Sequence, residues 1–344
     1  MGYKTGIYMG VLMSCLVFQL STRLQAQTTK QMLMKHMMDS MRAQAMDEYA
    51  TRYPMLRQAS FQYDVLGQRT VKGKLQGDPL FKGKASISRI RSNFNLPLAS
   101  WGKNKVTGSV NYQQFHYNMD QVKSLDPQST YPITNQKDTK SVVGFTGTFS
   151  RTDTLLGVPV SYSASMSGLT DEFTSIKRIN YLATVTVPIK RTATSSLTLG
   201  LVGIIDPSSI IPAIPVISYW RKFEGRNLDL YIDMPSRVQL RKQLGKRSWV
   251  FLGTELGGNI YFYDLNLPSL PENTIYSTVD LKTGFNLEHK LTKKIVVGMS
   301  GGFYSLFRSN LFDKKRKSNQ YFFETNGGTV PYISFSASLL PFLR

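Results

Sequence analysis

The sequence predicts a transmembrane, antiparallel, up-and-down β-barrel of about fourteen strands, with a short helical segment near the N-terminus. Three observations support this fold: an N-terminal stretch typical of an export signal, a repeated alternation of apolar and polar residues, and connections that are alternately short and long. The alternation is clearest over 158–167, where every odd position after Pro159 is serine and the even positions are apolar. Successive side chains of a strand point to opposite faces, so such a segment has one face suited to lipid and one suited to water.

The first 26 residues are typical of a cleaved secretory signal. Lys4 supplies a positive charge, residues 6–20 are mostly apolar, and Leu24-Gln25-Ala26 ends in a small residue suited to cleavage before Gln27. An apolar stretch of this length is too short to span a bilayer as a helix, which needs about 20 residues. We therefore assign residues 1–26 to a signal peptide and predict export.

Residues 27–58 differ in composition from the rest of the chain. Methionines alternate with charged residues there, and neither glycine nor proline occurs before Pro54. This composition predicts a helix of moderate amphipathicity. We expect a periplasmic leader or a plug at the barrel mouth, and a Met-rich helix that binds a partner is the alternative. The methionines are Met32, Met34, Met37, Met38, Met41 and Met46.

Residues 59–344 are predicted to form the barrel. The expected strands lie near 60–71, 85–98, 104–117, 139–151, 157–167, 176–189, 195–205, 213–223, 226–234, 237–244, 247–262, 274–289, 293–307 and 330–342. Merging the two segments around Pro235 and discarding the first segment would give twelve strands instead.

The connections favour fourteen strands. Bacterial barrels start and end in the periplasm, with short periplasmic turns and longer outer loops. Counting back from the C-terminus, the long connections 308–329, 263–273 and 118–138 then fall outside, and short ones such as 290–292 fall inside. A twelve-strand barrel would place the 118–138 loop on the periplasmic side.

The charged residues of the strands fall on the rows opposite the lipid-facing ones. A charge that faced lipid at mid-depth would cost about 2–4 kcal/mol for Arg or Lys, which favours placing these residues inward. Two interpretations remain open: a lumen filled by ion pairs and water, or a polar, somewhat cationic conduit. Asp229, Asp233, Arg237 and Arg241 lie on adjacent strands across the proposed turn at Pro235, so ion pairs between them are expected. The lumen-facing candidates are Arg89, Arg91, Arg178, Asp229, Asp233, Arg237, Arg241, Asp280 and Lys282, with Asn93, Asn95 and Glu288 on the same rows.

Aromatic residues gather near the ends of the expected strands. They include Trp101, Trp249, and the runs 219–220, 261–263 and 321–323. Aromatic rings are enriched at the membrane–water interface, so we expect these residues to form the two girdles of an outer-membrane barrel.

The chain is strongly basic, with 42 Lys and Arg against 22 Asp and Glu. Such an excess raises the question of nucleic acid, but the charges are scattered, no nucleic-acid-binding motif accompanies them, and export argues against that partner. The one dense run, 314–317, lies in the last outer loop, as a solvated loop or in contact with anionic glycolipid. We expect outer-membrane lipid, anionic glycolipid and, during insertion, the barrel-assembly machinery as partners, and no nucleic acid.

The sequence offers no enzymatic motif. The three histidines, His36, His116 and His289, have no nucleophile or metal partner placed beside them, and neither H-E-x-x-H nor G-x-S-x-G occurs. The lone cysteine, Cys15, lies inside the signal, because the apolar stretch continues past it, so the mature chain has no thiol for a disulfide or metal site. We expect no catalytic residues, no cofactor and no metal.

Residues 214–223, followed by 227–236, carry a familiar pattern: Pro215 and Tyr219 form a P-x-x-x-Y strand that leads to a strand ending at Pro235 and a tight turn. Over about 195–265 the chain resembles a family of uncharacterised outer-membrane β-barrel proteins, a domain of unknown function, from Gram-negative bacteria of the Bacteroidota type. The resemblance implies an outer-membrane barrel with a turn at Pro235, and it carries no ligand or catalytic residues. One departure is the C-terminus, where Phe342 is followed by Leu343 and Arg344 rather than ending the chain.

The sequence thus predicts a protein of the bacterial outer membrane, with a porin-like channel for small, possibly anionic solutes as the leading function. One alternative is a non-conducting structural or anchoring barrel for a surface complex. The other is a transporter of hydrophobic ligands of the fatty-acid type, which would need a lateral opening, for instance where Pro159 or Pro215 interrupts a strand.

Overall fold

A computed structural model describes residues 34, 37–38, 40–129, 131, 133–172, 174–267 and 269–342. The predicted signal peptide lies outside the described residues. The chain divides into two compact units, one up to Leu56 and one from Arg57, and each is described separately. In the first unit, residues 40–52 are helical and a 3-10 turn spans Pro54–Leu56. Within the described residues, no helix is long and apolar enough to cross a membrane.

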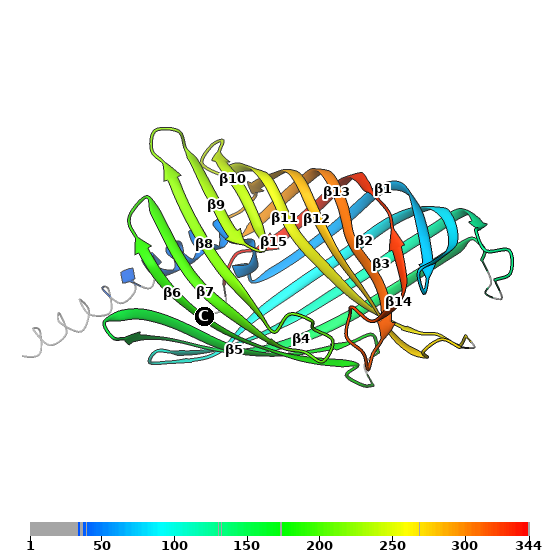
Figure 1. The fold of residues 1–344 in the computed structure, drawn as a ribbon. Helices are drawn as coiled ribbons and strands as arrows, with labels where there is room; N and C mark the ends of the chain where they lie inside the picture. The colour runs from blue at the N-terminus through cyan, green and yellow to red at the C-terminus, as the bar shows by residue number, and fades with distance from the viewer. Residues whose placement is uncertain are drawn as a thin grey trace, which may run out of the picture. The chain divides into compact units, whose positions relative to one another are not determined.

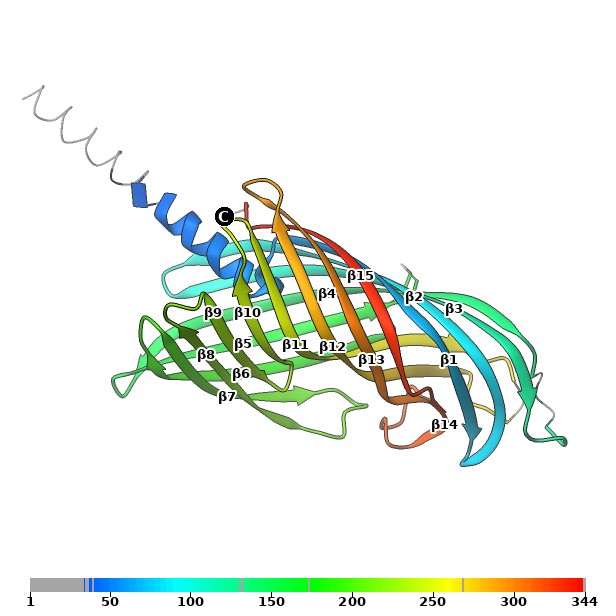
Figure 2. The ribbon, with the colours of Figure 1, turned by 90° about the horizontal axis from the view of Figure 1, so that it is seen from above.

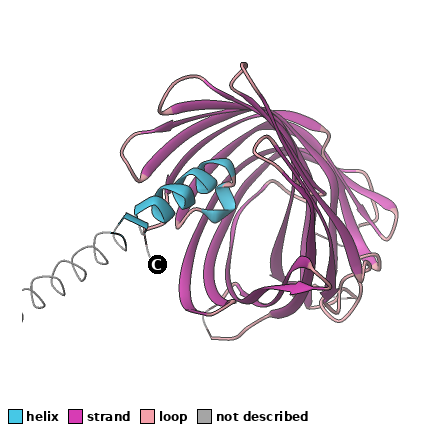
Figure 3. Cartoon of the chain, turned by 90° about the vertical axis from the view of Figure 1, so that its left-hand side faces the viewer, coloured by secondary structure: helices cyan, strands magenta, loops and turns pink. Residues whose placement is uncertain are grey.

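The second unit is a single antiparallel sheet that closes on itself (Figures 1 and 3). Its strands are β1 (Ala59–Leu75), β2 (Asp78–Trp101), β3 (Asn104–Ser124), β4 (Gln136–Leu155), β5 (Val158–Thr170), β6 (Arg178–Arg191), β7 (Ser195–Ile205), β8 (Ala213–Phe223), β9 (Leu228–Met234), β10 (Arg237–Gln243), β11 (Ser248–Asp264), β12 (Asn273–Lys290), β13 (Ile295–Asp313), β14 (Tyr321–Asn326) and β15 (Thr329–Leu339).

Each strand from β1 to β13 pairs with the next along the chain, and the ring closes where β1 pairs with both β14 and β15. β14 and β15 are two parts of one wall element, because β13 also pairs with both of them. They are separated at Gly327 and Gly328, and Gly328 has a φ of 61°, a left-handed conformation that glycine adopts without a steric penalty. The barrel therefore has fourteen wall elements, and the predicted fold is confirmed.

The alternative of twelve strands is wrong. β9 and β10 are separate strands joined by a two-residue turn that contains the cis peptide bond Met234–Pro235, and they pair in register from Arg237 with Asp233. The first predicted strand also exists, as β1. Connections at one end, which we call the long-loop end, include 125–135, 171–177 and 265–272, whereas those at the short-turn end span four residues or fewer.

Strand length divides the barrel into two sides (Figures 1 and 2). On the tall side, β1–β4 and β11–β13 run for 17–24 residues, and β14 with β15 completes the wall. On the short side, β5–β10 run for 7–14 residues. The predicted strands of the tall side were too short: β1 extends to Leu75, β3 to Ser124 and β13 to Asp313, so the predicted loops 118–138 and 308–329 are partly strand.

The wall is interrupted between the two sides at the long-loop end. β9 and β10 have seven residues each, fewer than the roughly 9–11 that a tilted strand needs to cross a bilayer. Beyond their turn, residues 257–264 of β11 pair only with β12, and residues 213–216 of β8 pair only with β7. The end of β11 instead reaches β4 across the interior, where Tyr261 packs in one buried cluster with Val142.

The outward rows carry the apolar residues that the sequence predicted. Exposed large apolar side chains occur on both sides of the barrel, as expected for a wall that faces lipid. Examples are Phe145, Val185, Leu199, Leu201, Leu252, Phe285, Phe303, Ile333 and Phe335.

Candidate functional site

The interior of the barrel is the candidate site, and its chemistry changes along single strands. On β2, the inward residues Arg89 and Arg91 lie toward the short-turn end, whereas Ile87, Ala85 and Phe81 follow toward the long-loop end. The outward residues change in the opposite sense, from Ile90 to the exposed Lys84 and Lys82. The tall strands thus have a polar interior at the level of the lipid-facing band and an apolar interior beyond it.

Asp64 is the centre of the largest group of charges. It is fully buried and accepts hydrogen bonds from Arg89 (3.1 Å), Arg91 (3.2 Å) and Lys282 (2.8 Å), and from the Ser334 hydroxyl. These donors come from β2, β12 and β15, so the Asp64 carboxylate on β1 links four strands of the tall side.

Asp280 extends this group. Arg89 also pairs with Asp280 at 3.4 Å, and Asn259 donates to the same carboxylate at 3.0 Å. The Arg89 guanidinium lies over the Tyr304 ring, 5.0 Å from its centroid. Arg89, Asp280 and Lys282 are almost fully buried, so these three predicted charges of the tall side face inward but are closed off from solvent.

Glu288 forms a second buried centre nearer the short-turn end. It accepts hydrogen bonds from Trp249 Nε1 (2.8 Å), Asn286 (3.2 Å) and the guanidinium of Arg57, just before β1. Arg57 also donates to Ser338 on β15 at 2.9 Å. This centre therefore fastens the beginning of the barrel domain to β11, β12 and the last strand.

The short side carries simpler ion pairs. Arg241 pairs with Asp229 at 3.2 Å, and Arg237 pairs with Asp233 at 2.8 Å, both between β9 and β10. Arg178, at the start of β6, pairs with Asp206 in the loop that follows β7. The structure thus places all nine predicted lumen-facing charges in ion pairs, with Arg91 a third exposed.

Hydroxyls line the inward rows of β4 and β5, where the tall side meets the short side. Thr146 and Thr148 of β4 face Ser167 and Ser165 of β5, with Oγ–Oγ distances of 2.8 and 2.9 Å. A third pair joins Thr152 and Ser161 at 3.0 Å. These side chains are half-buried or exposed, in contrast to the buried charges around Asp64.

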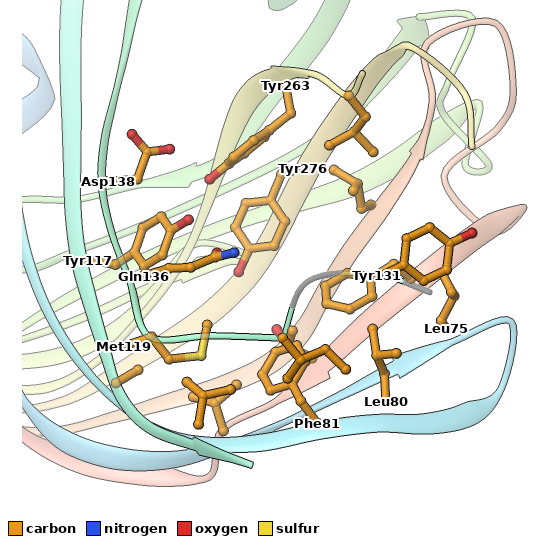
Figure 4. A pocket seen from close by; sticks show the side chains of 18 of the residues that line it. Leu75, Leu80, Phe81, Tyr117, Met119, Tyr131, Gln136, Asp138, Tyr263 and Tyr276 are labelled. Carbon is orange, nitrogen blue, oxygen red and sulfur yellow. The ribbon is translucent and has the colours of Figure 1, made fainter. Parts of the chain in front are cut away.

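A cavity of about 430 Å³ opens among the tall strands at the long-loop end (Figure 4). Its walls are mainly apolar, and a volume of this size is typical of sites for small molecules. Figure 4 shows Phe81, Leu80 and Met119 on one side of it, and Tyr117, Tyr263 and Tyr276 with Asp138 on another. Further lining residues include Arg69, Val71, Ala85, Ile87, Phe115, Leu265, Leu267, Leu270, Leu311 and Phe323.

Loop contacts hold the long-loop end together. Lys177, before β6, pairs with Asp171 (3.3 Å) and with Asp264 at the end of β11 (3.1 Å). Burial lowers the pKa of Lys177, but its hydrogen bonds to Asp264 and Asp171 outweigh this, and the net effect raises that pKa. The Ser318 amide donates to the Ser208 carbonyl at 3.0 Å, which joins the last loop to the loop after β7.

Two sequence interpretations need correction or addition. Trp249 and Tyr261 do not join an aromatic girdle: they are buried on inward rows, because the two-residue period sends alternate residues of an aromatic run inside.

Asp64 and Arg69 were missed as interior residues. Asp64 lies between the exposed Tyr63 and Val65, an alternation that could have revealed it, but a bulge between Leu66 and Arg69 hides the inward position of Arg69.

Charge is distributed unevenly between the two rims. Lysines and arginines gather around the short turns, where Asp153 and Glu224 are among the few acids. The sequence alone showed only the run at 314–317, because the antiparallel topology is what collects these residues from five separate turns. These cations are Lys103, Lys105, Lys190, Arg191, Arg221, Lys222, Arg226, Lys242, Lys246, Arg247, Lys290, Lys293 and Lys294.

The structure brings one histidine beside a serine. Ser248 Oγ lies 2.8 Å from His289 Nδ1 on neighbouring strands. A hydrolytic triad needs a third group that orients the imidazole, and within the described residues the His289 ring hydrogen-bonds only Ser248. Over the same part of the chain, no cluster of three or more His, Cys, Asp or Glu side chains is arranged to hold a metal ion.

Comparison with solved structures finds other barrels at low similarity. An outer-membrane channel from Pseudomonas putida F1 has a TM-score of 0.31 and 7% identity, with 82% of this chain and 96% of that chain covered. A FadL homologue from Pseudomonas aeruginosa has a TM-score of 0.30 and 9% identity, with coverage of 82% and 90%. The outer-membrane protease OmpT from Escherichia coli has a TM-score of 0.24 and 9% identity, with coverage of 81% and 95%.

At these levels the assignment of the fold rests on the strand pairing of this chain. A search among curated proteins gives no match. The sequence profile described as "Domain of unknown function (DUF6268)" matches residues 55–339, which is almost the whole barrel domain. The chain therefore belongs to the DUF6268 family.

Proposed function

We propose that this protein is an outer-membrane barrel that takes up small hydrophobic molecules through the cavity at its long-loop end. The cavity is the observation that carries this proposal. It is an apolar space of about 430 Å³ at the mouth of a barrel whose outer wall is suited to lipid. The strand pairing of the wall does not require such a space, whereas a small hydrophobic ligand does. On the predicted orientation this end faces the cell exterior, so the cavity is the first interior surface that an incoming molecule meets.

Two further features support hydrophobic over ionic traffic. The charges predicted to make the lumen cationic are paired, and those at Asp64 and Asp280 are buried, so they offer little free charge to a passing anion. The interruption beside β11 is the type of feature that a lateral exit into the membrane requires. Pro215 lies in the stretch of β8 that lacks a β9 partner, whereas Pro159 pairs normally with Thr154.

The test is binding of a neutral fluorescent hydrophobe, N-phenyl-1-naphthylamine, to the refolded full-length mature protein in non-ionic detergent. We expect saturable enhancement with the wild type and loss of binding in Ala85→Trp, which fills the cavity. Lys84→Gln, on the outward face of the same strand, is the matched control and should bind normally. Equal enhancement in the wild type and Ala85→Trp, at equal heat-modifiability on gels, would contradict the proposal.

A porin-like function for polar solutes is the second candidate, and the hydroxyl rows between β4 and β5 favour it. Rows such as Thr148–Ser165 present partly exposed hydroxyls that can exchange hydrogen bonds with a passing solute. Conductance of the refolded protein in planar bilayers distinguishes the two functions. Stable steps would support the porin-like function, whereas silence together with hydrophobe binding would support the first proposal.

A further inference from the structure

Arg69 is an unusual member of the apolar cavity. Its side chain is 8% exposed, yet Nε and Nη1 are buried and make no hydrogen bond within the described residues. Burying a guanidinium without a partner is costly, and buried charges are normally paired. A buried cation without an anion, in the wall of a cavity of ligand size, therefore points to an anion supplied by a ligand.

The surroundings hold Arg69 in place without neutralising it. Its guanidinium carbon lies 5.7 Å from the centroid of the Tyr304 ring, and a Cβ at Gly327 would come within 2.9 Å of its Nε. Glycine at 327 thus leaves the space that the guanidinium occupies. The bulge between Leu66 and Arg69 sends the side chain inward, since an unbroken two-residue period from Asp64 would send it outward.

The acidic side chains near Arg69 already form ion pairs with other cations. Asp64 accepts from Arg89, Arg91 and Lys282, and Asp280 accepts from Arg89, so these cations already outnumber the two carboxylates before Arg69 is added. Asp138, which also lines the cavity, lies 3.5 Å from its own partner Lys140. The interior next to Arg69 therefore has an excess of positive charge.

We infer that the cavity selects amphipathic anions: an apolar body fills the space lined by Phe81, Met119 and Leu311, and a carboxylate at one end pairs with Arg69. This inference rests on the proposed function and specifies its class of ligand. A guanidinium can bind a carboxylate through two parallel hydrogen bonds, which supplies orientation as well as affinity.

A matched pair of probes tests this: 11-(dansylamino)undecanoic acid and its methyl ester, which differ in charge and share the apolar body. Each is titrated into the full-length mature protein at pH 7.5, with dansyl fluorescence as the readout. We expect the acid to bind about 10- to 100-fold more tightly than the ester, the range for a charge-assisted hydrogen bond. Arg69→Met should remove this preference and leave the affinity for the ester unchanged, and Arg69→Lys should keep part of it.

Lys72→Gln is the control, because Lys72 lies on the outward face of β1 and the substitution removes one positive charge outside the cavity. This variant should prefer the acid over the ester as strongly as the wild type does. Equal affinity of the wild-type protein for acid and ester, or an unchanged preference in folded Arg69→Met, would overturn the inference while leaving hydrophobe uptake intact. Failure of both probes to bind the folded wild type would overturn the proposed function and this inference together.

Discussion

The tall and short sides of the barrel share one topology but differ in what their interiors do. On the tall side, inward charges are buried and linked across several strands, with an apolar cavity beyond them. On the short side, ion pairs join neighbouring strands or an adjacent loop, and partly exposed hydroxyls line the rows where β5 meets β4. Strand length accounts for the cavity, because only the strands that extend past the lipid-facing band reach the level at which the cavity lies.

The largest expected difference between the sides concerns Asp64. Asp64→Ala leaves Arg89, Arg91 and Lys282 without their shared carboxylate, and breaking a buried ion pair costs about 3–5 kcal/mol. Asp229→Ala removes the partner of Arg241 alone and should cost about 1–3 kcal/mol. Urea unfolding in lipid vesicles, followed by tryptophan fluorescence, measures both changes.

Asp153→Ala is the control for this pair. Asp153 lies near a short turn and pairs with the partly exposed Lys103 and Arg151, and surface ion pairs contribute at most about 1 kcal/mol, so its removal should shift the unfolding midpoint little. Equal losses for Asp64→Ala and Asp229→Ala would mean that the two sides are braced alike, contrary to the comparison.

The sequence predicted the wall of the barrel well and the contents of its interior only in part. Alternation located every wall element and the turn at Pro235, because lipid imposes the same requirement on every spanning strand. The alternation did not predict the parts of the strands that extend beyond the lipid-facing band. Lys72, Lys82 and Lys84 face outward beyond the band, so the pattern there resembles a loop rather than a strand. The bulge before Arg69 reverses the inward row within β1, and one sequence carries no sign of where such a bulge occurs.

The second prediction concerns the apolar part of the tall side. Phe81 packs on Phe323, with ring centroids 6.2 Å apart, and its ring lies against Gly73. Phe81→Ala should lower the free energy of unfolding by about 2–4 kcal/mol and weaken binding of the neutral hydrophobe. Leu182→Ala, at a half-buried inward position of β6, should cost about 1 kcal/mol and leave hydrophobe binding unchanged. The reverse order of effects in the same unfolding and fluorescence assays would place the apolar interior on the short side.

A charge exchange sharpens the contrast between linked and isolated pairs. On the short side, the double variant Asp229→Arg with Arg241→Asp should regain most of the roughly 1–3 kcal/mol that each single change loses, because the two side chains pair mainly with each other. On the tall side, Asp64→Arg with Arg89→Asp should regain little, since Arg91 and Lys282 would then face an arginine. Double-mutant cycles from urea unfolding give both coupling energies, and similar recovery on the two sides would refute the distinction.

The smallest effect is expected in the hydroxyl rows. Thr148→Val removes the hydroxyl that pairs with Ser165 at 2.9 Å, but Ser165 is only half-buried and can bond water instead, so the loss should be about 0.5 kcal/mol. The Thr148→Val variant is more informative for transport than for stability, because the same change makes part of the rows between β4 and β5 apolar. If polar solutes pass there, liposomes that carry Thr148→Val should swell more slowly in neutral sugars than those with the wild type, while Thr154→Val, at an exposed position near the turn, should not differ from it. Equal swelling in all three would separate the hydroxyl rows from transport and leave the tall-side cavity as the one interior surface that a ligand uses.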